Sequence, residues 1–287
     1  MEKMKTIWAL INEPGNAMEF IRYTVRLAKD IHAGVQLLYV QNPAAFPLGT
    51  PDSIGDEVVE VQQNLLEIAG AAEKTLDKMI REIEAEIPLD NPVEFHSELG
   101  NAASVLEDKV SKGAADMVML QGQSDESFWA RTSTNMDIIR NVHCPIWVVA
   151  PHTEYRPLKQ IIYATDYQEE DIPTLKRLVA LTAPFSPEIT ALHIVDDKDF
   201  KDKVQETGFD EIIRQKTGSD KIVMKTIQEK KDLDMPDIIN DLAARIDADL
   251  VVVLKENRHF LERIFKRSFT RKLIRQAKLS VLVFHEK

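Results

Sequence analysis

The chain has 287 residues, 44% of them hydrophobic and 29% charged, and a formal net charge of −11. This composition is typical of a soluble globular protein, the length predicts two ordinary domains, and no run approaches the roughly 18 apolar residues of a membrane span. The single cysteine, Cys144, excludes an intrachain disulfide and a cysteine-based zinc site, and the N-terminal apolar run is too short for a signal peptide, so we expect a cytoplasmic protein without membrane contact.

Short apolar runs alternate with helical patterns along the first half of the chain. Strands are expected near 5–12, 35–41, 92–98, 116–121 and 145–150, and helices near 16–32, 53–87, 101–112 and 130–141. The second helix has the clearest pattern, because apolar residues from Val58 to Ile87 recur at spacings of three and four and therefore share one face.

The second half has the same alternation. Strands are expected near 159–165, 188–195, 221–228, 249–254 and 280–284, and helices near 169–182, 201–216, 236–246 and 268–277. Strands such as VVVL and IWVV are apolar without alternation, which indicates that both of their faces are covered. Alternating strands and helices of this kind predict a parallel sheet flanked by helices.

The two halves also repeat each other in sequence. KTIWALIN at 5–12 parallels KQIIYATD at 159–166, ADMVML at 115–120 parallels ADLVVV at 248–253, and IIRNVHCPIWVV at 138–149 parallels LIRQAKLSVLVF at 273–284. Each unit is about 140 residues long, and the polar stretch PHTEYRP joins them. We therefore predict two tandem α/β domains, residues 1–151 and 157–287, each a doubly wound five-stranded parallel sheet.

With these features in this order, each unit resembles the universal stress protein domain. The residues that carry the resemblance are the Asp that ends strand one (Asp166), the ADLVVV run of strand four, and the CPIWVVAP form of strand five. The resemblance covers essentially the whole chain, twice, and implies an adenine nucleotide alpha hydrolase-like fold. It also implies pairing of the two fifth strands, which would place 146–149 beside 281–284 and make the chain an intrachain pseudo-dimer.

Many members of that family bind ATP through glycines that follow strand four. Glycines let the backbone approach phosphates, and backbone amides at a helix start hold the anion. In the second unit this register falls on Leu254, Asn257, Arg267 and Ser268, with the spacing kept and the glycines replaced. The first unit is two residues shorter here and keeps only Gly122, one position away.

The resemblance implies a cofactor site for ATP or AMP in the second domain only. In the family the strand-one Asp lies by the adenine and ribose, and the first domain has Asn12 in place of Asp166. The candidate cofactor-binding residues are Thr165, Asp166, Asn257, Arg267, Ser268 and Phe269. For Asp166 the alternative role is a cap on the following helix, and for Ser268 it is the N-cap of 268–277.

A basic segment separates the last two predicted strands. Residues 255–272 carry seven Lys or Arg and two Glu, although residues 1–152 carry 12 basic and 23 acidic residues. The segment is interpreted either as a solvated amphipathic surface or as a site where guanidinium groups replace the glycine amides on phosphate. The acidic first half should repel nucleic acid, so no nucleic-acid partner is expected.

The sequence gives little indication of catalysis. Cys144 and His143 are neighbours in the chain, but neighbours entering a strand point to opposite faces. No metal-ligand pattern, nucleophile elbow or P-loop occurs, so we assign no catalytic residue and no metal site. We expect a stress-response protein that is not an enzyme and acts on an unidentified protein partner. The alternative is an adenine-nucleotide hydrolase or transferase on the same fold, and a homodimer of the chain stays open.

Overall fold

The computed structural model describes residues 6–42, 54–122, 134–195, 200–228, 235–255 and 279–285. The expected helix 268–277 and the candidate residues Asn257, Arg267, Ser268 and Phe269 lie outside these ranges.

In the first half the expected strands and helices are all found. The elements are β1 (Thr6–Leu10), η1 (Pro14–Asn16), α1 (Met18–Asp30), β2 (Gly34–Gln41), α2 (Ile54–Glu86), β3 (Glu94–Leu99), α3 (Ala102–Ser111), β4 (Met117–Gln121), α4 (Thr134–Asn141) and β5 (Ile146–Val149). The short 3-10 turn η1 was not predicted. Its last residue, Asn16, is where the expected helix 16–32 begins, and Pro14 is favoured at the start of a helical turn.

The second half repeats this order. Its described elements are β6 (Gln160–Ala164), α5 (Asp171–Leu181), β7 (Glu188–Val195), α6 (Phe200–Thr217), β8 (Ile222–Gln228), α7 (Met235–Ile246), β9 (Leu250–Leu254) and β10 (Ser280–Phe284).

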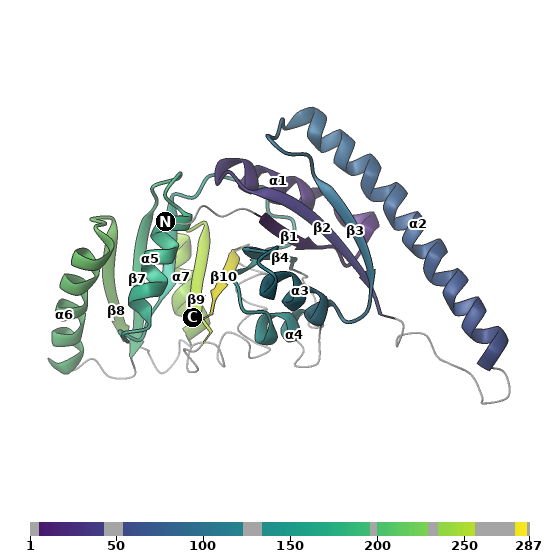
Figure 1. Ribbon diagram of the computed structural model, residues 1–287. Coiled ribbons are helices and arrows are strands. Elements are labelled where there is room, and N and C mark those ends of the chain that lie inside the picture. The colour runs from purple at the N-terminus through teal and green to yellow at the C-terminus, as the bar shows by residue number, and fades with distance from the viewer. Residues whose placement is uncertain are drawn as a thin grey trace.

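The described strands form one continuous ten-stranded sheet (Figure 1). Its order is β3-β2-β1-β4-β5-β10-β9-β6-β7-β8, so the second half repeats the strand order of the first in reverse across the sheet. Strands within each half are parallel, and the two halves meet where β5 pairs antiparallel with β10. The predicted fold class, with two doubly wound parallel halves, is confirmed.

Helices cover both faces of the sheet, which explains why the strands lack polar alternation. Ile7 and Ala9 of β1 pack into the cluster that holds side chains of α1, α2, α5 and α6. Trp8 and Leu10, which point the other way, pack into the cluster that holds side chains of α3, α4 and α7. Both clusters contain residues from the two halves, so each core layer runs through the whole chain.

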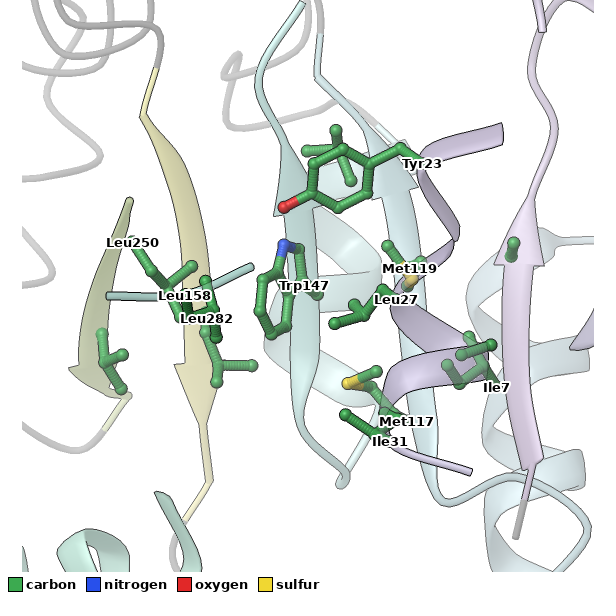
Figure 2. Close-up of a cluster of buried hydrophobic side chains, with 14 of the residues drawn as sticks. Ile7, Tyr23, Leu27, Ile31, Met117, Met119, Trp147, Leu158, Leu250 and Leu282 are labelled. Carbon is green, nitrogen blue, oxygen red and sulfur yellow. The ribbon is translucent and has the colours of Figure 1, made fainter. Parts of the chain in front are cut away.

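The joint between the halves is a strand pair with a shared core. Val281 lies opposite Val148, Leu282 opposite Trp147, and Val283 opposite Ile146, which confirms the expected pairing of the fifth strands. Trp147 and Leu282 are buried between Tyr23 on one side of the joint and Leu158 on the other (Figure 2). The pairing removes two exposed sheet edges, which would otherwise be open to another chain.

The linker between the halves is fixed to both of them. The Tyr155 hydroxyl donates to the carboxylate of Asp30 in α1, and Arg156 Nη1 lies 3.0 Å from Asp247 Oδ2 at the start of β9. Burial and the neighbouring Asp30 charge raise the pKa of Tyr155, so the phenol keeps its proton. The polar stretch that marks the boundary in sequence is therefore a docked segment.

Helix α2 runs along the outside of the first half, beside β3 (Figure 1). Its apolar stripe is buried at Leu65, Ala72, Leu76 and Ile83, as the spacing predicts, but Ile68 of the same stripe is 39% exposed, and Leu66 on another face is 73% exposed. None of the helices that the structure describes combines the length and apolar character needed to cross a membrane.

Candidate functional site

Thr165 and Asp166 lie at the carboxyl end of β6, which is where ligands bind in doubly wound sheets. The Thr165 side chain is buried, and its hydroxyl donates to Asp171 Oδ2 at 2.7 Å and accepts from the backbone N–H of Tyr167 at 2.9 Å. Thr165 therefore organises the turn after the strand. The Asp166 side chain is 29% exposed, with Oδ1 3.7 Å from His193 Nδ1. Of these two candidates, Asp166 is the one that presents its side chain toward solvent.

Tyr167 covers the neighbouring strand ends. Its backbone is left-handed, with φ of 56°, which is unfavourable for a bulky residue. The ring is buried at 4.5 Å from the ring of His193 in β7 and 5.2 Å from that of Phe209 in α6, and its hydroxyl lies 2.8 Å from Thr226 Oγ1 in β8. The Tyr167 ring is therefore packed against β7 and α6, with its hydroxyl held by β8.

Asp171 is a buried carboxylate that sequence analysis missed. It accepts hydrogen bonds from the Tyr163 hydroxyl at 2.6 Å, from Thr165, and from the backbone N–H of Gln168 at 3.1 Å. Burial raises the pKa of Asp171, although these donors favour the charged form. The N-cap residue of α5 is Glu170, whose side chain makes no capping bond.

One cation of the basic segment, Lys255, lies within the described residues. It follows β9 directly, and its backbone N–H donates to Phe284 O at 2.8 Å. Its ammonium group donates to the carbonyl of Arg140 in α4, which belongs to the first half. Lys255 therefore binds the end of α4, where a cation is favoured by the helix dipole.

The first domain has a cavity of about 580 Å³ at the carboxyl ends of β1, β4 and β5. This is the point where the strand order reverses between β1 and β4. Its described lining includes the carboxylates of Glu13 and Glu19 and contains no lysine or arginine. Asn16 Nδ2 donates to Glu13 Oε2 at 3.0 Å, and His152 Nδ1 lies 3.7 Å from Glu19 Oε2. The cavity is therefore acidic.

Gly122 lines this cavity and has a packing role. A Cβ atom at this position would lie 2.5 Å from the carbonyl oxygen of Val149, closer than real Cβ contacts come. The Gly122 N–H donates to the same oxygen at 2.8 Å. The one glycine that survives near the motif in the first unit is thus explained by the close approach of the two strand ends.

Cys144 and His143 have separate environments, as expected for neighbours entering a strand. Burial raises the pKa of the Cys144 thiol to about 12. His143 is exposed, and its Nδ1 lies 3.1 Å from Glu107 Oε1. His193 is largely buried, with its Nδ1 2.8 Å from Thr165 O. Among the described residues, no group of three or more His, Cys, Asp or Glu is placed to hold a metal ion.

Comparison with known proteins accounts for the repeated fold. The sequence model of the universal stress protein family matches residues 4–150 and again residues 157–285. The chain therefore belongs to the universal stress protein family and carries two domains of that type in tandem. A comparison with curated protein sequences finds no match.

Solved structures of the same arrangement cover nearly the whole chain. A universal stress protein from Archaeoglobus fulgidus DSM 4304 is 12% identical, with a TM-score of 0.64 over 98% of this chain and 96% of its own. A functionally unknown protein from Pseudomonas aeruginosa PAO1 is 13% identical, with a TM-score of 0.57 over 99% and 93%. The cytoplasmic domain of a prokaryotic cation chloride cotransporter is 12% identical, with a TM-score of 0.54 over 98% and 95%. At these identities the likeness shows the shared fold.

Proposed function

We propose that the chain is a stress-response protein that acts by binding a protein partner, and that its second domain alone holds an adenine nucleotide, ATP or AMP. The observation that carries the assignment to one domain is the acidic lining of the cavity in the first domain. We further propose that the domains comprise residues 1–151 and 157–287 and that the chain works in the cytoplasm.

The cavity in the first domain is unsuited to phosphate. Glu13 and Glu19 place two carboxylates where the family's ligand site lies, and Asn16 and His152 are the described polar partners of these carboxylates. Two like charges close to a triphosphate repel it, and the effect is strongest in a concave site. This half of the chain also carries the whole net charge of −11.

The second domain has an aspartate at the end of its first strand, and the first domain lacks one. Asp166 stands at the end of β6 with a partly exposed carboxylate, next to the backbone fixed by Thr165. Asn257, Arg267, Ser268 and Phe269 follow β9 in the sequence, and we assign the contacts with phosphate to this segment. Guanidinium groups there would bind phosphate through side chains, in the place of glycine amides.

Binding rather than catalysis fits the described side chains. The Cys144 thiol is buried and protonated, which argues against a cysteine nucleophile. The α2 helix offers a long surface on the outer edge of the first half (Figure 1). Leu66 and Ile68 are exposed on it, and α2 is the surface that we assign to the protein partner.

The test is isothermal titration of the nucleotide-free chain with ATP and with AMP. We expect one site per chain, lost in Asp166→Ala and in an Arg267→Ala, Arg271→Ala double variant, and kept in Glu13→Gln. Binding that survives the Asp166 and arginine changes, or that is lost in Glu13→Gln, would contradict the assignment to the second domain. ATP turnover abolished by Asp166→Ala would favour the hydrolase alternative.

A further inference from the structure

His285 lies at the joint between the two halves. It follows β10 directly and is 2% exposed. Its Nδ1 lies 2.9 Å from the carbonyl oxygen of Cys144, and its Nε2 lies 2.9 Å from the carbonyl oxygen of Ile139 in α4. A side chain from the second half therefore spans two backbone carbonyls of the first half.

Both of these contacts need a donor on the histidine. A carbonyl oxygen only accepts hydrogen bonds, while a neutral imidazole carries one N–H and one lone pair. A neutral His285 would therefore set a lone pair against a carbonyl oxygen at 2.9 Å, in a place almost closed to water. The imidazolium form has an N–H on each nitrogen and satisfies both carbonyls.

The position of Ile139 also favours a positive charge. Its carbonyl lies in the last turn of α4, whose C-terminal end carries the negative end of the helix dipole. The Ile139 and Cys144 carbonyls thus present two partial negative charges to one ring. Hydrogen bonds from a charged donor are stronger than neutral ones, which offsets part of the cost of burying the cation.

The other charged and titratable groups around His285 come from four elements. The His143 ring lies 5.8 Å from the His285 ring and is itself paired with Glu107 of α3. Arg177 of α5 donates to the backbone oxygen of His285 at 2.8 Å. Among the described residues, Arg140 of α4 directly follows Ile139, Lys255 after β9 donates to the Arg140 carbonyl, and the thiol of Cys144 is neutral. The cations oppose protonation of the His285 ring and the Glu107 carboxylate favours it, so these charges offset one another in part. The two carbonyls in direct contact with the ring are therefore taken to determine its protonation state.

We propose that His285 is an imidazolium clamp that holds the two halves together and releases them as pH rises. Loss of the proton leaves one of the two carbonyls without a donor, which weakens the contact between α4 and β10. The contribution to stability is complete below about pH 6.5, the ordinary histidine value of the unfolded chain, and is lost at higher pH when the folded ring loses its proton.

Nitrogen NMR of the histidine rings in the intact chain tests the protonation state without any substitution. We expect both nitrogens of His285 to carry protons at pH 6. A single N–H on His285 throughout pH 5.5–8.5 would overturn the proposal.

Hydrogen exchange tests the mechanical consequence. Exchange rates are first corrected for the intrinsic effect of pH. The protection factors of the β5 and β10 amides should then fall by at least about tenfold between pH 6 and pH 8.5. A fall of this size corresponds to the loss of one hydrogen bond from a charged group. The loss should be absent in β2 and β7, which lie far from the joint. Protection of β5 and β10 that does not change over this range would overturn the proposal.

Two variants separate His285 from its neighbour. His285→Phe keeps a ring without donors and should remove most of the pH dependence of the joint, while His143→Gln removes the adjacent imidazole and should leave that pH dependence in place. If the pH dependence disappears in His143→Gln, the clamp is the wrong explanation. The two measurements on the unmodified chain decide the question if His285→Phe does not fold.

Discussion

Leu282→Ala tests whether the two halves share one core. Leu282 is fully buried in β10 and lies in register with Trp147 of β5, so its side chain belongs to the joint and to neither half alone (Figure 2). The same apolar cluster contains Leu158 from the linker and Leu250 from β9.

The expected loss of folding free energy in Leu282→Ala follows from the complete burial of this side chain. Truncating a fully buried leucine removes its transfer free energy and leaves a cavity, which costs about 3 to 5 kcal/mol when the surroundings cannot collapse. Trp147 and its neighbours are held by strand pairing on both sides, so little collapse is expected and the loss should be about 3 kcal/mol or more.

Urea unfolding followed by tryptophan fluorescence measures the effect. Trp147 is 1% exposed and lies opposite the substitution, so it contributes a signal from the joint to an emission that Trp8 and Trp129 share. We expect a single transition shifted to lower urea with an unchanged slope. Val223→Ala is the matched control, because Val223 is also a strand residue but is 56% exposed, and it should change the free energy of unfolding by less than about 0.5 kcal/mol.

Two results would refute the reasoning. A loss below about 1 kcal/mol in Leu282→Ala would mean that the joint is loosely packed. Two separate unfolding transitions in the unmodified chain would mean that the halves unfold independently, which a continuous sheet with shared core layers does not allow.

Three further predictions concern the site. Gly122→Ala should lower the free energy of unfolding by about 1 to 3 kcal/mol, because its Cβ would meet the Val149 carbonyl at 2.5 Å, whereas Gly15→Ala has open space and should be close to neutral in thermal unfolding. Cys144 should resist thiol reagents in the folded chain and react in urea, since burial raises its pKa to about 12; rapid labelling of folded protein would contradict this. The pKa of Asp171 is raised above its ordinary 3.8, so the folded chain binds the proton more tightly and lowering the pH from 7 to 5 should stabilise the unmodified chain relative to Asp171→Asn; an equal pH response in both chains would count against it.

The fold could be predicted from the sequence because its signals are local. Apolar runs such as Val251–Val253 indicate that both faces of the strand are buried, and the internal repeat shows that the strands of the second half follow the same order along the chain as those of the first. The joint could be predicted through the family resemblance, which implies pairing of the two fifth strands, and Val281 indeed lies opposite Val148.

The details of the site could be predicted only in part, because they depend on residues distant in sequence. Nothing in the local pattern marks Tyr167, whose ring is placed by His193 and Thr226 on two other strands. The same holds for His285, whose partners lie 141 and 146 residues away. Asp166 could be found because a family motif places it at a strand end.

Because the two domains are joined in one chain, a substitution can be made in one of them without being made in the other. In a dimer of identical subunits every substitution is made twice, so a charge or a loop cannot be confined to one side of the joint. Here the antiparallel pair of β5 and β10 keeps the twofold arrangement while the two partners are encoded separately. One half carries the excess of acidic residues and the carboxylate-lined cavity, and the other carries the strand-end aspartate and the basic segment. Covalent linkage thus gives the assembly an asymmetry that symmetric pairing forbids, and it keeps the two partners together at any dilution.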